Sequence, residues 1–194
     1  MTVSETDPAA LDAALRDTPR TRHLPPAQQG YAALDRALPI GLGQTNSQPR
    51  TVRIMLSALD VHSGHRVLDV GSGSGWCTVL LARLVGPAGQ VIGVELVPEL
   101  TAWGRANVEA ADVPWATIEQ AEGDTLGYPA SAPFDRILVS AAARTVPPSL
   151  VDQLAPDGVM VIPVRGELLK VRPGQEQEHL GRYDFVPLIE PGQE

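Results

Sequence analysis

A glycine-rich turn directly after an apolar strand is the strongest chemical signal in the sequence. The expected strand at residues 67–70 contains Asp69, and Gly71, Gly73 and Gly75 follow at once. Glycines there let a ligand approach the backbone, and the next helix offers free N–H groups. The GxGxG spacing differs from the dinucleotide fingerprint GxGxxG, and an acid beside the turn opposes a pyrophosphate. The acid suits a ligand with an amino group and a sulfonium cation, which points to S-adenosyl-L-methionine; an ordinary tight turn is the alternative.

Two further acids stand where neighbouring strands are expected to end. Glu95 lies 26 positions after the acid of the glycine turn and closes the expected strand at residues 91–94. A carboxylate there can accept hydrogen bonds from both hydroxyls of a ribose. Leu96 then either flanks an adenine ring or simply packs. In Gly123-Asp124, the acid can accept a hydrogen bond from an adenine amine, or it is an ordinary β-turn acid.

Ser47 is the serine with the most distinctive setting, within the polar segment at residues 43–49. A serine hydrolase would carry GxSxG and a histidine partner, and neither pattern is evident. We therefore expect the Ser47 hydroxyl to donate or accept hydrogen bonds rather than to attack a substrate. An ordinary loop serine is the other interpretation.

Alternating strands and helices must position these turns. This alternation predicts an α/β fold with a mainly parallel sheet, whose ligand-binding loops gather at the carboxyl ends of the strands. Expected strands lie at residues 67–70, 91–94, 116–121, 137–139 and 159–164, with two antiparallel candidates at 168–171 and 183–186. Expected helices lie at residues 11–15, 27–38, 51–59, 76–85, 99–111 and 149–154, and residues 41–50 form a polar loop. The chain is expected to be a single domain over residues 1–194, divided at residue 50 into an N-terminal part and a core.

Composition narrows the possible partners. The net charge of −8 and an aromatic content of 4% disfavour a nucleic-acid-binding surface. One cysteine, Cys77, excludes an internal disulfide and a thiolate zinc site, and we expect no metal. The four histidines are expected at the surface, and Cys77 as a small buried side chain. No apolar run reaches membrane-spanning length and the acidic N-terminus carries no signal peptide, so we expect a cytoplasmic protein without membrane contact.

Several longer stretches resemble one known family. LPIGLGQTNSQP precedes the first strand of the core, VLDVGSGSGW contains the glycine turn, and APFDRILVSAAA, QLAPDGVMVIPV and FVPL follow. Together they resemble the protein-L-isoaspartate (D-aspartate) O-methyltransferases, as a divergent bacterial-type member, from about residue 24 to residue 188. The glycine turn alone is typical of any class I methyltransferase, whereas GQTxSQP and the C-terminal FVPL are specific to this family.

The resemblance implies a fold, a reaction and a set of site residues. The fold is a three-layer, doubly wound, Rossmann-like class I methyltransferase sandwich with seven strands, the last in the family's altered order, and an N-terminal helical segment. The reaction transfers a methyl group from S-adenosyl-L-methionine to the α-carboxylate of an L-isoaspartyl residue, and the ester then closes to a succinimide that hydrolysis partly converts to aspartate. The expected cofactor-binding residues are Asp69, Gly71, Ser72, Gly73, Glu95, Leu96, Gly123 and Asp124. The expected substrate-binding residues are Thr45, Asn46, Ser47 and Gln48, with Ser47 contacting the substrate carboxylate.

The sequence also departs from the family pattern. Asn46 replaces the usual isoleucine before the serine, Arg50 the usual aromatic residue or histidine, and Thr125 the last glycine of GDG. Repair of isoaspartyl proteins by a monomeric enzyme is our leading interpretation. Two alternatives are a carboxyl methyltransferase acting on a biosynthetic peptide or small acid, and an inactive module that binds the cofactor.

Overall fold

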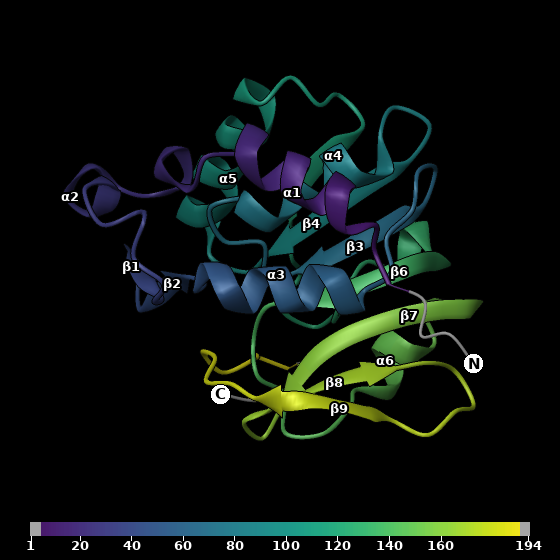
Figure 1. The fold of residues 1–194 in the computed structure, drawn as a ribbon. Helices are drawn as coiled ribbons and strands as arrows, with labels where there is room; N and C mark the ends of the chain where they lie inside the picture. The colour runs from purple at the N-terminus through teal and green to yellow at the C-terminus, as the bar shows by residue number, and fades with distance from the viewer. Residues whose placement is uncertain (1–4, 191–194) are drawn as a thin grey trace.

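The computed structural model describes residues 5–190, and a seven-stranded sheet forms its centre (Figure 1). The strand order is β5-β4-β3-β6-β7-β8-β9. The strands are β3 (Arg66–Val70), β4 (Gln90–Glu95), β5 (Ala116–Gln120), β6 (Phe134–Val139), β7 (Leu154–Val164), β8 (Glu167–Val171) and β9 (Glu178–Arg182). The neighbouring strands β5, β4, β3, β6 and β7 run parallel, so their carboxyl ends share one edge of the sheet.

The last two strands, β8 and β9, extend the sheet beyond β7 as an antiparallel addition in chain order. The predicted strand at residues 168–171 is confirmed within β8, but the one predicted at 183–186 is wrong. The strand is β9 instead, which begins five positions earlier and ends at Arg182. β9 is an edge strand with mostly exposed residues, so it carries no apolar alternation for a sequence pattern to detect.

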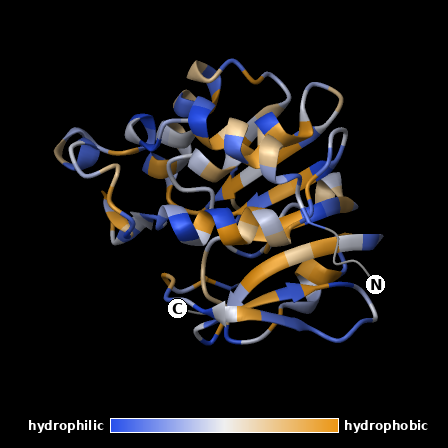
Figure 2. Cartoon of the chain, in the orientation of Figure 1, coloured by the Kyte–Doolittle hydropathy of each residue, from blue (hydrophilic) through white to orange (hydrophobic). Residues whose placement is uncertain are grey.

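Side chains alternate between the two faces of the parallel strands, and the strands appear mainly hydrophobic in Figure 2. On β3, Val67 belongs to one core and Leu68 to the other, and Val91 and Ile92 on β4 divide in the same way. Because both faces are buried, the strands are nearly continuous apolar runs, as expected for a parallel sheet.

The two faces are covered unequally. One face packs against α1 (Pro8–Asp17), α3 (Pro49–Ala58), α4 (Trp76–Val85) and α5 (Pro98–Ala110). The other is covered by the short helix α6 (Pro148–Val151), by η2 (Pro129–Ser131) and by the loops around them. The α/β sandwich is confirmed, with a thin second outer layer.

The N-terminal part differs most from the sequence prediction. After α1 come η1 (Arg20–His23) and the single-turn helix α2 (Pro26–Gln29), so the helix predicted at residues 27–38 is wrong. The loop predicted at 41–50 is in fact largely a hairpin of β1 (Leu38–Gly41) and β2 (Gln44–Asn46), followed by α3. Gly41 and Gly43 have positive φ, which explains how so polar a stretch turns sharply. The single-domain prediction, with its division at residue 50, stays a prediction.

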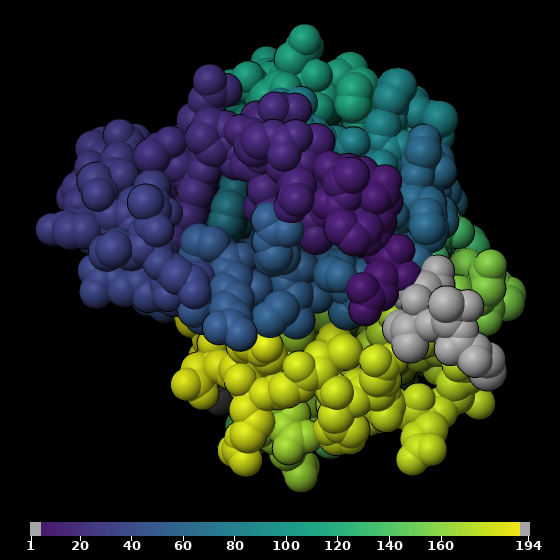
Figure 3. Space-filling model, viewed as in Figure 1, coloured from purple at the N-terminus to yellow at the C-terminus, as the bar shows by residue number. Residues whose placement is uncertain are grey.

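In the view of Figure 3, the N-terminal part (purple to blue) occupies the left and the centre of the visible face, above the C-terminal residues (yellow). Among residues 5–190, no helix is long and apolar enough to cross a lipid bilayer.

Candidate active site

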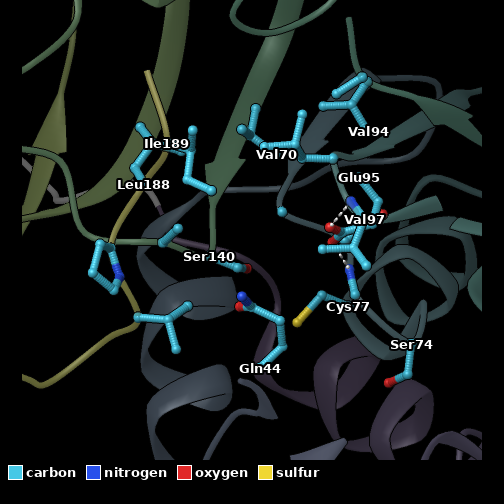
Figure 4. A pocket seen from close by; sticks show the side chains of 18 of the residues that line it. Gln44, Val70, Ser74, Cys77, Val94, Glu95, Val97, Ser140, Leu188 and Ile189 are labelled. Atoms are coloured by element: carbon cyan, nitrogen blue, oxygen red, sulfur yellow. Dashed lines mark hydrogen bonds between the residues drawn. The ribbon is translucent and has the colours of Figure 1, made fainter. Parts of the chain in front are cut away.

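A cleft opens at the carboxyl edge of the parallel strands. Its floor comes from the ends of β3, β4 and β6, and the β1–β2 hairpin forms one wall. Figure 4 shows Leu188 and Ile189 on one side of the cleft and Glu95 and Val97 on the other. Polar groups on a largely apolar lining are typical of small-molecule sites, and the position is that expected for parallel α/β sheets.

Most of the predicted site residues meet in this cleft. The nine that line it are Thr45, Asn46, Ser47, Gly71, Ser72, Gly73, Glu95, Leu96 and Gly123. Three others do not line it: Asp69 is buried behind the glycine turn, Gln48 lies beside the cleft, and Asp124 is exposed. The structure therefore joins the predicted cofactor and substrate segments, although residues 45–47 and 71–73 are far apart in the sequence.

The glycine turn is held by hydrogen bonds to the end of β4. The N–H groups of Gly71 and Ser72 donate to the carbonyl of Val94 at 2.9 and 3.1 Å. Gly75, directly before α4, has φ 79°, a conformation that favours glycine. The glycine turn is thus fixed by β4, the strand that carries Glu95, and α4 begins directly after the turn.

Glu95 is a buried carboxylate held by two backbone donors. Its Oε2 accepts from the N–H of Gly73 at 2.8 Å and its Oε1 from the N–H of Val97 at 2.9 Å, as the dashed lines in Figure 4 show. The side chain is 7% exposed. Each carboxylate oxygen has a second lone pair, so Glu95 can still accept hydrogen bonds from a pair of hydroxyls.

Asp69 lies on β3, behind the glycine turn, and is fully buried. Its Oδ2 accepts from the Thr78 hydroxyl at 2.7 Å, whereas Oδ1 has no hydrogen-bond partner among the described residues. Burial raises the pKa of Asp69 from 3.8 to about 7, with Glu95 adding a smaller repulsion. The Ser72 hydroxyl oxygen, in the cleft lining, is also buried without a partner in the described chain.

The segment that carries Ser47 is anchored from outside the cleft. Gln48 Nε2 donates to Asp35 Oδ2 at 3.0 Å, and the backbone N–H of Arg50, in the first turn of α3, donates to Asp35 Oδ1 at 2.9 Å. The Arg50 N–H bond is the main reason why the pKa of Asp35 lies below its ordinary value. Gln48 therefore fixes the segment, while Ser47 is half-buried in the cleft wall.

The sequence interpretation did not single out some residues of the cleft. Gln44, Cys77 and Ser140 lie between its two sides in Figure 4. The C-terminal segment at residues 186–189 forms another wall of the cleft. The N–H of Leu188 in this segment donates to the carbonyl of Ala142 at 2.8 Å. Ser140 directly follows β6, so its place at the carboxyl end of a strand was a usable signal.

Two expectations about single residues need correction. Cys77 is half-buried and lines the cleft instead of being wholly enclosed. Burial raises the pKa of its thiol, so the thiol stays protonated at neutral pH. His23 is only 2% exposed, contrary to the surface position expected of the histidines. Within the described part of the chain, no group of three or more His, Cys, Asp or Glu side chains is arranged to hold a metal ion.

A parallel sheet with a glycine turn after β3 and an acid at the end of β4 is the arrangement of the Rossmann-like class of proteins that bind a nucleoside-containing cofactor. The sequence profile of the protein-L-isoaspartate (D-aspartate) O-methyltransferase family matches residues 5–190. The chain belongs to this family.

Individual relatives agree with this assignment. The protein-L-isoaspartate O-methyltransferase of Anaeromyxobacter dehalogenans strain 2CP-C is 52% identical over 159 residues, which are 81% of this chain and 74% of that protein. A solved protein-L-isoaspartate O-methyltransferase superposes with a TM-score of 0.82 at 23% identity, covering 94% of this chain and 62% of the solved one. A Plasmodium falciparum structure described as a putative member, in complex with S-adenosyl-L-homocysteine, gives a TM-score of 0.78 at 24% identity and covers 94% and 91%.

Proposed function

We propose that this protein methylates the α-carboxylate of L-isoaspartyl residues in damaged proteins or peptides, with S-adenosyl-L-methionine as the methyl donor. One observation carries the proposal: a single cleft joins the segment of Ser47 to the glycine turn and to Glu95. Membership of the isoaspartate methyltransferase family supports the same substrate.

The residues present fit S-adenosyl-L-methionine. Buried polar atoms seldom lack partners; of the three side-chain atoms that do so among the described residues, Asp69 Oδ1 and Ser72 Oγ lie at the glycine turn and Glu190 Oε1 lies elsewhere. The Ser72 hydroxyl would hold the amino-acid end of the cofactor. Asp69, whose pKa of about 7 leaves it partly protonated at neutral pH, would be drawn towards its ionised form by the cofactor's cationic groups in front of the turn. Glu95 would accept hydrogen bonds from the ribose hydroxyls, with Leu96 and Gly123 beside the adenine ring. The side chain of Asp124 is exposed and lies outside the cleft lining, so its expected hydrogen bond to the adenine amine stays a prediction.

The reaction needs no general base from the protein. The bound cofactor supplies an activated methyl group on a sulfonium. A carboxylate with a pKa of about 4 is already an anion at neutral pH, so the chain only has to hold its oxygen in line. We assign this to the segment of Ser47, whose hydroxyl donates to the carboxylate, and to Thr45 beside it. Apolar side chains at residues 186–189 line this part of the cleft, and a less polar surrounding would favour a step that neutralises charge.

The repair outcome is tested by following one isoaspartyl peptide over time. Incubation with the protein and S-adenosyl-L-methionine at neutral pH should convert the peptide through a methyl ester and a succinimide to a mixture containing the aspartyl form. Chromatography separates all four species. A peptide that stays isoaspartyl, under conditions in which S-adenosyl-L-homocysteine binds, overturns the proposal.

The cellular setting is also part of the proposal. We propose a monomeric protein of the cytoplasm that acts on isoaspartyl proteins without nucleic acid or membrane, since its net charge of −8 disfavours polyanions. Sedimentation of the purified chain would test the monomer.

A further inference from the structure

Arg20 is a buried cation that ties down the segment of the proposed substrate serine. Its side chain is 6% exposed at the start of η1. Nε donates to Asn46 Oδ1 at 2.7 Å, and Nη2 donates to the carbonyls of Asn46 and Ser47 at 3.0 and 2.9 Å. The same guanidinium also bonds the loop before the hairpin, through the carbonyls of Ala32, Leu34 and Arg36 at 3.4, 3.1 and 2.8 Å. All three of its nitrogens are thus used, and three of its bonds reach residues 46–47.

Arg20 also contacts the cofactor side of the cleft. Its guanidinium carbon lies 5.6 Å from the ring centre of Trp76, the first residue of α4 after the glycine turn. A cation over an indole face is favourable, and more so where water is excluded. One side chain therefore touches both the substrate segment and the end of the cofactor turn.

Asn46 makes a second connection between these two segments. Its Oδ1 accepts from Arg20, and its Nδ2 donates to the Ser74 hydroxyl at 3.3 Å. Ser74 is in the glycine turn, and its carbonyl accepts from His23 Nδ1 at 3.0 Å and from Asn107 Nδ2 at 2.9 Å. Asn46 and Ser74 are 5% and 2% exposed. The polar residue that replaces the family's usual isoleucine therefore joins η1 to the cofactor turn instead of facing only the cleft.

The charge of Arg20 is retained despite its burial. Desolvation lowers the pKa of Arg20 to about 10, which still leaves it protonated at neutral pH. Loss of the Arg20 guanidinium would remove its hydrogen bonds to the carbonyl oxygens of Asn46 and Ser47. A buried carbonyl that loses its donor is costly. Lysine at this position would keep the charge but could not make the same set of bonds, because its single ammonium has no planar fork.

We infer that Arg20 is a positioning residue that couples the substrate segment to the cofactor turn through Asn46 and Ser74, so that binding of cofactor orders residues 44–48. This inference rests on the proposed function only for the identity of the substrate. The coupling itself concerns two segments of this chain and can be measured with S-adenosyl-L-homocysteine alone.

Hydrogen exchange followed by mass spectrometry tests the coupling without a substrate. In the wild type, S-adenosyl-L-homocysteine should slow exchange both at residues 71–76 and at residues 44–48. In Arg20→Lys, the protection at residues 71–76 should persist while that at residues 44–48 falls by about tenfold, the size expected for lost bonds to a charged group. Arg22→Lys, an exposed neighbour on the same turn, is the matched control and should behave as the wild type.

A kinetic measurement separates positioning from folding. With an isoaspartyl peptide, Arg20→Lys should raise the peptide KM by about tenfold. The cofactor KM should stay within about twofold, because the glycine turn and Glu95 are unchanged. Thermal melting shows whether each variant folds. Equal ligand protection of residues 44–48 in the wild type and in Arg20→Lys overturns the coupling, whatever the substrate is. Loss of protection at both segments in a folded variant also overturns it, because Arg20 would then merely support the cofactor turn.

Discussion

Ser47 has a role in this account that is separable from cofactor binding, because it lies in the hairpin wall and not in the glycine turn. Ser47→Ala should lower kcat/KM for an isoaspartyl peptide by about tenfold to a hundredfold, the loss expected for one hydrogen bond to an ionised group. The affinity for S-adenosyl-L-homocysteine should be unchanged in calorimetry.

The matched control is Ser57→Ala, since Ser57 lies on α3 outside the cleft lining and should tolerate the change. An equal loss of cofactor affinity and turnover in Ser47→Ala would remove Ser47 from the substrate side of the site.

Asp69 should make stability depend on pH. Its pKa is about 7 in the folded protein and about 3.9 when unfolded. Because the folded pKa is raised, its contribution to stability is fully present below about pH 4 and is lost as the pH rises through about 7. In urea unfolding, the free energy of unfolding of the wild type minus that of Asp69→Asn should therefore decline by about 4 kcal/mol between pH 4 and pH 8. A difference that does not vary with pH would contradict the assignment of this shift to Asp69.

Residues fixed by local chemistry were predictable from the sequence, and those fixed by tertiary contacts were not. The glycines and Glu95 are recognisable because turns and strand ends restrict residue type. Arg20 and His23 look like ordinary surface residues, since nothing near them in the sequence shows that residues 46 and 74 will surround them. The same limit explains why Gln48 was expected to contact substrate although its amide bonds Asp35.

At the scale of elements, α5 and the glycine turn approach each other too closely for any side chain between them. A Cβ on Gly104 would lie 2.6 Å from the carbonyl oxygen of Gly73 and 2.9 Å from Ile118 Cδ1. Gly104→Ala gains about 1 kcal/mol of helix propensity, but the turn must move to make room. We expect the Kd of S-adenosyl-L-homocysteine to rise by about tenfold in calorimetry.

The matched control for Gly104→Ala is Gly30→Ala, where an added Cβ meets nothing within 4 Å. If Gly104→Ala binds S-adenosyl-L-homocysteine as tightly as the wild type does, the contact between α5 and the turn does not determine the cofactor site.

The core elements were predictable because apolar periodicity and breaking residues agree there. The helix predicted at residues 76–85 matches α4, which starts after Gly75 and ends before Gly86. The β1–β2 hairpin was not found, since β1 contains a proline and a glycine and β2 is three residues long and entirely polar. Its stability comes from Leu38 and Ile40, which pack in a small cluster with Leu24 and Leu100. Such long-range packing has no local sequence pattern.

At the scale of the whole molecule, segments from both ends of the chain meet at one edge of the sheet. Residues 44–47, 71–74 and 186–189 share the cleft, and the C-terminal segment is fixed there by a parallel bridge between Ala142 and Pro187. The topology of parallel sheets predicts that the loops after strands gather at this edge. It does not predict that the β1–β2 hairpin, which precedes the first strand of the central sheet, and the C-terminal segment complete the walls of the cleft.

Methyl transfer from radiolabelled S-adenosyl-L-methionine to two versions of one synthetic peptide tests the central claim most directly. One version contains L-isoaspartate and the other aspartate at the same position, so only the geometry of the carboxylate differs. The account predicts base-labile label in the isoaspartyl peptide and none above background in the aspartyl peptide. Equal labelling of both, or none in either while S-adenosyl-L-homocysteine binds, would contradict it.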